Sequence, residues 1–535
     1  MALTLIAGWL RFSSIGFGLP DQFRPDEERI VPTALGFEKD WNPHYELYPA
    51  AQTYLVHGAL RSCAILTGLG RNLQTAYGSN NGAQAFLIAR RISAAMGTLT
   101  VPIIYLAVAP VFGTAAAIAS AAIIAVCYID VRESKFAKVE VPAALWLALS
   151  ILMMLRIATR AHLIDYAVAG FFCGLAAATH YSAGAISIGI FVAHVEARRR
   201  ENQPMLASRL APRIYLAGLV AILTFACANP YFFLDLRQTV LDFAFLRSTY
   251  AATWNGDHSP GSYGWSWLML RAMPAAFGIE LEIFLLAAML WVVFRPRPGT
   301  FALLAFVVVC FLMLTHGHPQ LVFRYLVIPL LAMAVLGGVF AADLIALACS
   351  RMGTRPGLVM AGLAGILMLA PSLMRDVQLD ALLDQTDTRT LARKWMSEHI
   401  SPASSLVLVS GDGFGKPQVA GMYNPLPVHS LDCLKRATKS AQWVVSDSFP
   451  PLSVWSAGAT DAELAELNSE GTLEFDVDSI RPGTETPIFD PNDAFYVPFN
   501  HTTSMLRPGP RIRIWKITAS PGGSTVPAAF PPGGC

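Results

Sequence analysis

The segment LPDQFRPDEERIVPTALGFEKDWNPHYELYPA, residues 19–50, is the first polar stretch of the chain and follows an apolar N-terminus. It carries adjacent carboxylates at Asp26 and Glu27, a few residues beyond an expected membrane-spanning helix. Pro25 followed by acids is also an ordinary helix start, because proline suits the first turn and carboxylates suit the positive end of the helix dipole. The sequence therefore leaves two alternatives here, a catalytic acid pair at the membrane surface or a plain helix N-terminus.

The composition predicts an integral membrane protein. Of the 535 residues, 54% are hydrophobic and 14% are charged, and the mean hydropathy is +0.47. Soluble domains carry about 25% charged residues, so this chain falls outside that class. A net charge of +2, without a basic tract interleaved with aromatic residues, argues against a nucleic-acid partner. We expect no cleavable signal peptide, because the N-terminal apolar run lacks a preceding basic region.

Apolar runs predict a polytopic α-helical protein with about eleven membrane-spanning helices. Lysine and arginine are concentrated in alternate short loops, which we therefore expect on the cytoplasmic side of the cell inner (plasma) membrane. This rule places the N-terminus inside and the C-terminal region outside. The predicted spans are 1–19, 91–112, 114–130, 141–157, 166–179, 182–196, 213–231, 273–294, 300–315, 325–347 and 358–374.

Two outer loops are too long to be simple connectors. Residues 20–90 include AAQTYLVHGALRSCAILTG, whose helical apolar periodicity is interrupted by Gln52, His57 and Arg61. This pattern predicts interfacial helices in the first outer loop rather than a further span. Residues 232–272 are rich in aromatic side chains, as is typical of a membrane interface.

The composition changes near residue 376, where hydropathy drops. Short β-rich runs, SSLVLVS, QWVVSDS and RIRIWKIT, alternate with the helical patterns DTRTLARKWMSEHI and DAELAELNSE. The sequence thus predicts a transmembrane domain at 1–375, an extracytoplasmic α/β domain at 376–520 and a disordered Pro/Gly-rich tail at 521–535. The glycine-rich GDGFGKP at 411–417 is interpreted as a turn.

Ionisable and aromatic residues gather in the loops expected on the outer face. Such groups are costly at membrane level unless they pair or function, so their convergence predicts a site. Each also has a plainer alternative: Arg324 as a helix anchor, the lysines as a solvated loop, and His180 as an interhelical hydrogen-bonding group. The set comprises Asp26, Glu27, Arg132, Glu133, Lys135, Lys138, Glu140, His180, Tyr181, His316, His318, Arg324 and Tyr325.

These residue types suit one kind of chemistry. A carboxylate can act as the general base on a hydroxyl acceptor. Arginine and lysine can hold a phosphate leaving group, arginine through a bidentate fork. A lipid-borne phosphate cannot leave the bilayer and must be met at headgroup level, where these loops are expected.

Several motifs carry a resemblance to a known family. They are RPDEERIV, NPHYELYP, ARRISAAMGTLTVPIIYL, RESKFAKVEVPAALW, GLAAATHYSAG and FRYLVIPLL. Over about residues 1–375 the chain resembles the C-type (GT-C) membrane glycosyltransferases, in the branch of protein O-mannosyltransferases and lipid A aminoarabinose transferases. It looks most similar to bacterial members described as phospholipid carrier-dependent glycosyltransferases.

The resemblance implies inverting transfer of a sugar from a polyprenyl-phosphate carrier to a protein, glycan or lipid acceptor on the extracytoplasmic side. Asp26 would be the base that deprotonates the acceptor, with Glu27 supporting it. The implied donor-phosphate contacts are Arg324, Lys135, Lys138 and His180, and the implied substrate contacts are Glu140, His44, Tyr48, Tyr181 and Tyr325.

Two departures from the family pattern matter. Glu140 stands where an aspartate is usual, and His180 stands where relatives often carry lysine, so a neutral imidazole would hold phosphate less strongly. Metal dependence varies within the superfamily and no His/Asp spacing here decides it, which leaves a divalent cation open as a cofactor.

Two other classes of protein compete with a glycosyltransferase. A polytopic transporter or lipid flippase would use its charges as a substrate path, but the ionisable residues are expected on one face rather than at the midplane, and no inverted repeat is visible. A catalytically inactive scaffold presenting the C-terminal domain is the third alternative.

Overall fold

The computed structural model describes residues 1–21, 23, 26–70, 72–78, 82–201, 211–251, 264–316, 322–409, 416–419, 422–423, 425–428, 430–448, 459–490 and 497–518. The chain divides into two compact units. The first unit contains Met1–Ile15 and Asp26–Val377, and the second contains Gly16–Pro25 and Gln378–Cys535. A short piece of the first predicted outer loop therefore belongs to the second unit.

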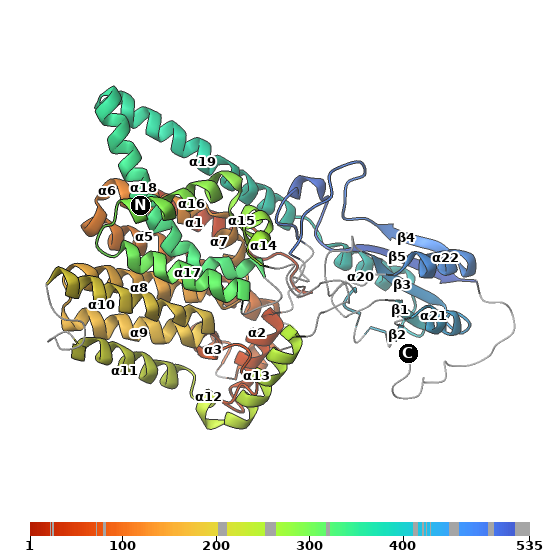
Figure 1. Ribbon diagram of the computed structural model, residues 1–535. Helices are drawn as coiled ribbons and strands as arrows, with labels where there is room; N and C mark the ends of the chain where they lie inside the picture. The colour runs from red at the N-terminus through yellow and green to blue at the C-terminus, as the bar shows by residue number, and fades with distance from the viewer. Residues whose placement is uncertain are drawn as a thin grey trace. The chain divides into compact units, whose positions relative to one another are not determined.

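The first unit is helical (Figure 1). Its long helices carry apolar residues all round, which is typical of helices in an apolar medium. The elements are α1 (Ala2–Phe12), α2 (Glu27–Gly36), α3 (Ala51–Leu66), α4 (Leu73–Tyr77), α5 (Gly82–Phe112), α6 (Thr114–Val126), α7 (Tyr128–Ser134), α8 (Glu140–Thr159), α9 (Leu163–Thr179), η1 (Tyr181–Ala185), α10 (Ile186–Arg200), α11 (Ala211–Ala228), α12 (Tyr231–Leu234), α13 (Leu236–Ala251), α14 (Trp265–Trp267), η2 (Leu268–Ala272), α15 (Met273–Phe277), α16 (Ile279–Phe294), α17 (Thr300–His316), η3 (Phe323–Leu326), α18 (Val327–Met352) and α19 (Thr354–Leu383).

Among the described residues, four helical segments, in α5, α8, α18 and α19, are long and apolar enough to cross a membrane. The number rises to six if each of two bent helix pairs counts as one span. Shorter apolar helices are Ala2–Phe12, Leu163–Thr179, Pro212–Ala228 and Thr300–His316. Every predicted span contains helix, but the predicted number of eleven is not confirmed.

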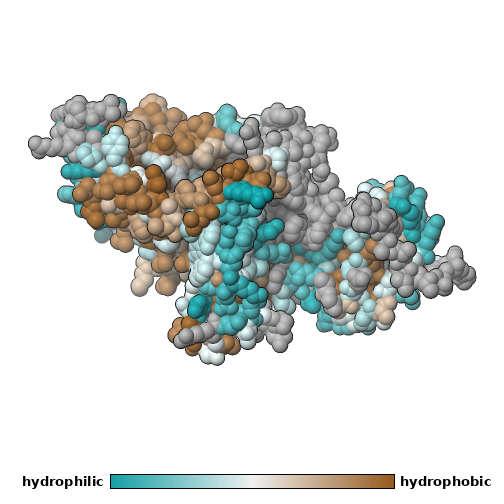
Figure 2. Space-filling model, turned by 90° about the horizontal axis from the view of Figure 1, so that it is seen from below, coloured by the Kyte–Doolittle hydropathy of each residue, from teal (hydrophilic) through white to brown (hydrophobic). Residues whose placement is uncertain are grey.

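The surface of this unit fits a membrane protein. Figure 2 shows broad hydrophobic areas on the helical unit. Large apolar side chains stay exposed there, including Ile222, Leu290 and Leu367 at 64%, 61% and 73%. Exposed apolar area of this extent is expected where lipid is the solvent.

Small residues let neighbouring helices approach closely. A Cβ atom added to Gly170 of α9 would lie 2.2 Å from the carbonyl oxygen of Ala217 in α11, and one added to Gly174 would lie 2.5 Å from that of Ala221. Glycine at these positions therefore allows backbone contact between the two helices, as in other membrane bundles.

The segment that leads to the site begins at a break between α6 and α7. The two helices are bent by 54°, and the guanidinium of Arg11 donates to the carbonyl oxygens of Ile124 and Ala125 at 2.8 and 3.0 Å. Arg11 also forms a buried ion pair with Asp130 in α7. One α1 side chain thus satisfies carbonyl groups at the break and fixes the start of α7.

The second unit contains a five-stranded sheet with the order β2-β1-β3-β5-β4. β1 pairs in parallel with β2 and β3, whereas β5 is antiparallel to β3 and β4. The elements are α20 (Thr388–His399), β1 (Leu406–Val409), β2 (Leu426–Val428), α21 (Leu431–Ala437), β3 (Trp443–Ser448), α22 (Asp461–Glu470), β4 (Gly471–Val477), η4 (Thr502–Ser504) and β5 (Arg511–Ile517).

Helices cover both faces of this sheet (Figure 1). Alternate strand residues point to opposite faces, so neighbours such as Val444 and Val445 enter different cores. One core includes Leu434 of α21 and Leu467 of α22, and the other includes Met396 of α20. The predicted tail at 521–535 and most of the predicted turn at 411–417 lie outside the described residues.

Candidate active site

Asp26 precedes α2, and its side chain is turned away from the helix end. Glu27 and Glu28 occupy the first turn, where acids suit the helix dipole, but Asp26 makes no side-chain capping hydrogen bond. Its Oδ1 instead accepts a hydrogen bond of 3.2 Å from the Tyr48 hydroxyl. The plain helix start is therefore present, and the Asp26 carboxylate is directed to other partners.

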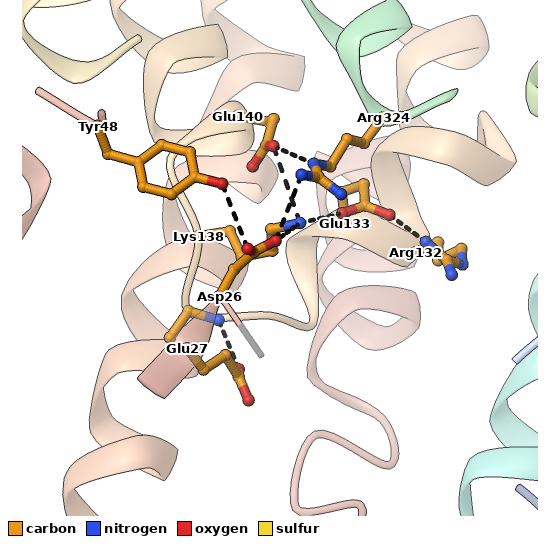
Figure 3. A network of polar contacts seen from close by, with 9 residues as sticks. Asp26, Glu27, Tyr48, Arg132, Glu133, Lys138, Glu140 and Arg324 are labelled. Carbon is orange, nitrogen blue, oxygen red and sulfur yellow. Dashed lines mark hydrogen bonds and ion pairs between the residues drawn. The ribbon is translucent and has the colours of Figure 1, made fainter. Parts of the chain in front are cut away.

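Two cationic side chains meet the second carboxylate oxygen of Asp26 (Figure 3). Lys138 Nζ lies 2.8 Å from Asp26 Oδ2, and Arg324 Nη2 lies 3.4 Å from the same oxygen. Lys138 comes from the loop between α7 and α8, and Arg324 comes from η3 just before α18. Three segments that are distant in the sequence thus converge on one carboxylate.

Glu140 and Glu133 extend this cluster. Glu140, the first residue of α8, places Oε1 2.8 Å from Arg324 Nε and 3.8 Å from Lys138 Nζ. Glu133 Oε2 lies 3.8 Å from Lys138 Nζ, and its Oε1 pairs with Arg132. Lys138 therefore lies among three carboxylates, and Arg324 lies between two.

The formal charges of this network balance, with three acids and three bases. Burying an unpaired ion costs several kcal/mol, so the pairing is what permits such burial. The side chains of Lys138 and Glu140 are 2% and 0% exposed, and that of Arg324 is 9% exposed. Asp26 is 24% exposed, so it is the member of the cluster that an incoming molecule reaches most readily.

A cavity of about 330 Å³ adjoins the cluster. Tyr48, which bonds to Asp26, and Tyr325, whose ring centroid lies 5.6 Å from the Arg324 guanidinium carbon, both line it. The wall is mainly apolar and aromatic, as in most small-molecule sites. The lining residues are Tyr45, Leu47, Tyr48, Pro49, His180, Tyr181, Ser182, Phe243, Cys310, Met313, Leu314, Tyr325 and Ile328.

His180 and Tyr181 supply polar groups to this wall. His180 Nδ1 lies 2.8 Å from the Ser182 hydroxyl, and its ring packs edge-on against Tyr325 with the centroids 5.3 Å apart. The Tyr181 hydroxyl donates to the carbonyl oxygen of Glu46 at 2.9 Å. The structure thus brings four predicted residues, Tyr48, His180, Tyr181 and Tyr325, to one cavity.

Glu27 lies apart from the partners of Asp26 and points away from them (Figure 3). Its carboxylate forms a bidentate pair with Arg90 of α5, at 2.8 and 2.7 Å, and accepts the Ala137 N–H at 2.7 Å. Glu27 is 0% exposed. This geometry joins α2, α5 and the loop before α8, and it places the Glu27 carboxylate on Arg90 instead of beside the Asp26 carboxylate that it was predicted to support.

Two further predicted residues lie away from the cluster. Lys135 is buried, and its Nζ donates to the carbonyl oxygens of Leu10 and Ser13, at the C-terminal end of α1. His44 is largely exposed and pairs with Asp40 at 2.7 Å. His316 bonds to its neighbour Thr315 on an exposed surface, and His318 is outside the described residues.

The sequence analysis did not single out Arg90, and it included Glu133 in the outer-face set without a specific role. An arginine inside an apolar helix usually indicates a functional or paired charge, and Arg90 in ARRISAAMG lies in such a helix. Glu133 was recognised as an outer-face acid, but spacing alone does not reveal that it faces Lys138. Only the fold distinguishes Lys138, inside the network, from Lys135, three positions earlier.

Burial raises the pKa of two groups in the loop before α3. Burial and the neighbouring Asp26 carboxylate raise the pKa of Tyr48 well above its usual range, despite an opposing effect of Arg324. Tyr48 therefore stays a neutral hydrogen-bond donor to Asp26. Burial also raises the pKa of Glu46 to about 7, and the charges of Asp242 and Asp235 act in the same direction.

A divalent cation was left open by the sequence. Within the described part of the chain, no group of three or more His, Cys, Asp or Glu side chains is arranged to hold a metal ion. The carboxylates of the cluster are instead paired with Lys138, Arg132 and Arg324. The described residues of the cluster thus form ion pairs rather than a metal-binding group.

Part of the site lies in a segment with a known family pattern, whereas Asp26, Tyr48, Arg324 and Tyr325 lie outside it. Residues 82–231 match the family model of dolichyl-phosphate-mannose-protein mannosyltransferases. The matched segment contains Arg90, Lys138, Glu140 and His180. The match confirms the predicted resemblance over these residues. The comparison with curated proteins gives no match.

Three solved structures show the extent of similarity to known proteins, each with a TM-score below 0.5. Archaeal oligosaccharyltransferase AglB from Archaeoglobus fulgidus, in complex with an inhibitory peptide and a dolichol-phosphate, has a TM-score of 0.49 and 15% identity, covering 90% of this chain and 73% of that one. ArnT from Cupriavidus metallidurans, bound to undecaprenyl phosphate, has a TM-score of 0.49 and 14% identity, covering 97% and 98%. Arabinofuranosyltransferase AftD from Mycobacteria has a TM-score of 0.45 and 14% identity, covering 97% and 41%.

Proposed function

We propose that this chain is an inverting membrane glycosyltransferase that moves a sugar from a polyprenyl-phosphate carrier to an acceptor on the extracytoplasmic side. The observation that supports this most strongly is the convergence of Lys138 and Arg324 on the partly exposed carboxylate of Asp26, beside the cavity. A base and two phosphate-binding cations within one contact distance are what such a transfer requires.

In this proposal Asp26 is the general base. The ion pairs with Lys138 and Arg324 favour the ionised carboxylate before the acceptor arrives. Asp26 takes the proton of the acceptor hydroxyl or amine as the acceptor atom bonds to the anomeric carbon. The bond between that carbon and the phosphate oxygen breaks, and polyprenyl phosphate leaves from the opposite face of the sugar.

The charge balance of the cluster favours the departure of the phosphate once Asp26 has taken the proton. The donor phosphodiester carries one negative charge, and the leaving monoester gains a second as the bond breaks. Proton uptake neutralises Asp26 in the same step and leaves the cations of a formerly balanced network in excess. Lys138 and Arg324 then attract the phosphate more strongly in the transition state than in the ground state, and such a difference lowers the barrier.

The cavity would hold the groups next to the reacting bond. Its aromatic wall offers flat surfaces to a sugar or to the first isoprene unit, and the hydroxyls of Tyr48 and Tyr181, which donate to Asp26 and to Glu46 O, can each still accept a hydrogen bond. Glu140, paired with Arg324, would orient the guanidinium toward the phosphate. His180 would contribute a weaker phosphate contact from the other side of Tyr325.

The proposed orientation places the N-terminus in the cytoplasm and the second unit, as an α/β domain, outside the inner membrane. A reporter enzyme that folds only outside the cytoplasm, fused to the C-terminus, should be active. An inactive but intact fusion would reverse the assignment of sides.

The function is tested by comparing a deletion strain with its parent. Mass spectrometry of envelope glycans, glycolipids and glycoproteins should show one sugar missing from one class of acceptor, and purified protein should restore it from a polyprenyl-phosphate donor. Transport of the intact lipid-linked sugar without bond cleavage would support a flippase and overturn the proposal.

A further inference from the structure

A buried arginine, Arg198, lies in the last turn of α10, at the end of this helix that is remote from the cavity. α10 begins shortly after the cavity residues His180 and Tyr181. The twelve residue steps from Ile186 to Arg198 cover roughly 18 Å along the helix axis, at about 1.5 Å per residue. Arg198 is 2% exposed. The chemistry proposed above therefore gives this buried charge no role.

Two nitrogens of the Arg198 side chain have no hydrogen-bond partner. Nε and Nη2 are buried, and in the part of the chain that the structure describes neither donates to an acceptor. No described carboxylate forms an ion pair with Arg198 either. Burying a cation is costly unless an anion and hydrogen-bond acceptors accompany it. Arg198 therefore has the charge and the donors of a binding group, without a protein anion to bind.

Two further arginines hold the turn between α8 and α9 at this end of the helical unit. Arg200 of α10 donates to Ala158 O at the end of α8, and Arg213 of α11 donates to Ala161 O in the turn itself. α8, α9, α10 and α11 lie side by side (Figure 1). The two hydrogen bonds thus tie α10 and α11 to the turn that joins the other two helices.

The guanidinium groups of Arg198 and Arg213 come near one place, beside His194 of α10. The Tyr166 hydroxyl of α9 lies 2.8 Å from His194 Nδ1. Arg198 follows His194 by one helical turn, on the same face of α10. Arg198 and Arg213 both lie close enough for their charges to act on the His194 ring and on Tyr166. Two arginines from different helices therefore converge, an arrangement that suits a phosphate group.

The charge of the surrounding residues also favours an anionic ligand. Six arginines and three acids, a net charge of +3, occur in residues 156–165, 196–201 and 211–215. Glu196 accepts backbone N–H groups at the start of α17, and Asp165 lies in the first turn of α9, where a carboxylate suits the helix dipole. Glu201 is exposed just after α10. The positive charge is therefore in excess at this end of the bundle.

The same end borders on the lipid-facing surface. Leu163 and Ile164 in the first turn of α9 are 54% and 67% exposed, and Tyr215 in the first turn of α11 is 71% exposed. Exposed apolar side chains suit the hydrocarbon, and tyrosine suits the headgroup level. The proposed orientation places this end on the cytoplasmic side, where basic sites between membrane helices bind anionic headgroups.

We propose that Arg198 and Arg213 form a binding site for a phosphate group, and that this phosphate belongs to the headgroup of an anionic phospholipid. The Arg198 guanidinium reaches the phosphate by turning toward the membrane surface, while the apolar stem of the side chain stays packed between the helices. The bound phosphate supplies the anion that the fold does not, so lipid binding stabilises the helical unit. The proposal does not depend on the sugar transfer proposed above.

Thermal unfolding of the full-length protein in neutral detergent tests the site with three probes. They are phosphatidylglycerol, which is anionic, phosphatidylcholine, which has no net charge, and inorganic phosphate. Phosphatidylglycerol should raise the melting temperature of the wild type more than either of the other two. Arg198→Met should weaken the apparent affinity for phosphatidylglycerol about tenfold or more, because a charge-assisted contact is lost. Arg199→Met, which removes the exposed arginine at the next position of α10, should respond like the wild type.

The lipid-free protein distinguishes ligand binding from a purely structural role of Arg198. Without lipid, Arg198→Met should melt at or above the wild-type temperature, because the substitution removes an unpaired buried charge. A lower melting temperature of Arg198→Met without lipid, or a wild-type response of this variant to phosphatidylglycerol, would overturn the proposal. Inorganic phosphate that stabilises the wild type as much as phosphatidylglycerol does would overturn the assignment to a lipid.

Native mass spectrometry of the wild type gives a second measurement that needs no variant. From an equal mixture of the two lipids, phosphatidylglycerol should remain bound to the protein in preference to phosphatidylcholine. Equal retention of the two lipids would contradict the proposal.

Discussion

Lys138 Nζ and Asp26 Oδ2 lie 2.8 Å apart, and Lys138 is almost fully buried while Asp26 is 24% exposed. This pair joins the loop between α7 and α8 to the start of α2. It also gives the partly exposed carboxylate a fixed positive neighbour in an environment where an unpaired charge would be costly.

Two nearby lysines should differ in their effect on turnover. Lys138→Met removes a cation from the cluster, so turnover should fall strongly, and stability should fall as well because the buried carboxylates of Glu133 and Glu140 lose a positive neighbour. Lys135→Met leaves the buried carbonyl oxygens of Leu10 and Ser13 without their donor, a loss of about 1–3 kcal/mol for each unsatisfied group. Thermal unfolding and a turnover assay on both variants provide the measurement, and equal effects on turnover would show that the two lysines act alike.

Arg324→Ala should mainly weaken donor binding. Removing a charge-assisted contact to phosphate costs about 1.5–3 kcal/mol, or roughly tenfold to a hundredfold in affinity. Arg324→Lys keeps the positive charge but has one nitrogen, so it cannot contact both Asp26 and Glu140 as Nη2 and Nε of the arginine do. Its loss of donor affinity should therefore be smaller than that of Arg324→Ala. Titration with the polyprenyl-phosphate sugar measures both. An unchanged affinity in Arg324→Ala would show that Arg324 only anchors α18.

Much of the site could be predicted, because the chemistry sets the residue types and the membrane restricts their depth. Asp26, Lys138, Glu140 and Arg324 were all identified from outer-face loops and a family resemblance, and they form one network. The direction of a side chain was the part that sequence could not supply. Glu27 neighbours Asp26, yet it faces Arg90 because successive residues at a helix start point in different directions.

The helices and strands of the fold could also be predicted from the sequence, but the division of the chain into units could be predicted only in part. Apolar runs predicted the helices, and β-rich runs predicted strands of the second unit, because the residue patterns of helices and strands can be recognised in the sequence. The assignment of Gly16–Pro25 to the second unit was not predictable, because it depends on contacts between residues about 370 positions apart, such as Asp21 and Arg393.

Glu27→Gln should destabilise the protein. Arg90 would lose a full negative partner in a site where both side chains are buried, and breaking such a pair costs about 3–5 kcal/mol. Chemical or thermal unfolding in detergent should show this loss, together with faster proteolysis near α2. A variant of unchanged stability that had lost all turnover would return Glu27 to a direct part in the chemistry.

Glu46 should make stability depend on pH. Its pKa is about 7 in the folded protein against 4.5 for an ordinary glutamate, so the fold favours the protonated form. The stabilisation is complete below about pH 4.5 and is lost as pH rises toward 7, because the folded state then binds more protons than the unfolded state. Glu46→Gln mimics the protonated side chain and should flatten this dependence. Parallel pH profiles for the two proteins would contradict the assignment.

The central claim is that Asp26 removes the acceptor proton, and turnover measured beside donor binding in Asp26→Asn tests it most directly. The amide keeps the size of the side chain but cannot take the proton, so transfer should fall by at least a hundredfold, at the low end of general-base effects of about 10² to 10⁴. Donor affinity should be retained or should rise, because the neutral amide leaves the charges of Lys138 and Arg324 to the phosphate, and the melting temperature should stay close to that of the wild type. Asp40→Asn, a change to an exposed acid on the other side of α2 that pairs with His44, serves as the control and should transfer sugar normally. Turnover by Asp26→Asn at the wild-type rate would contradict the account.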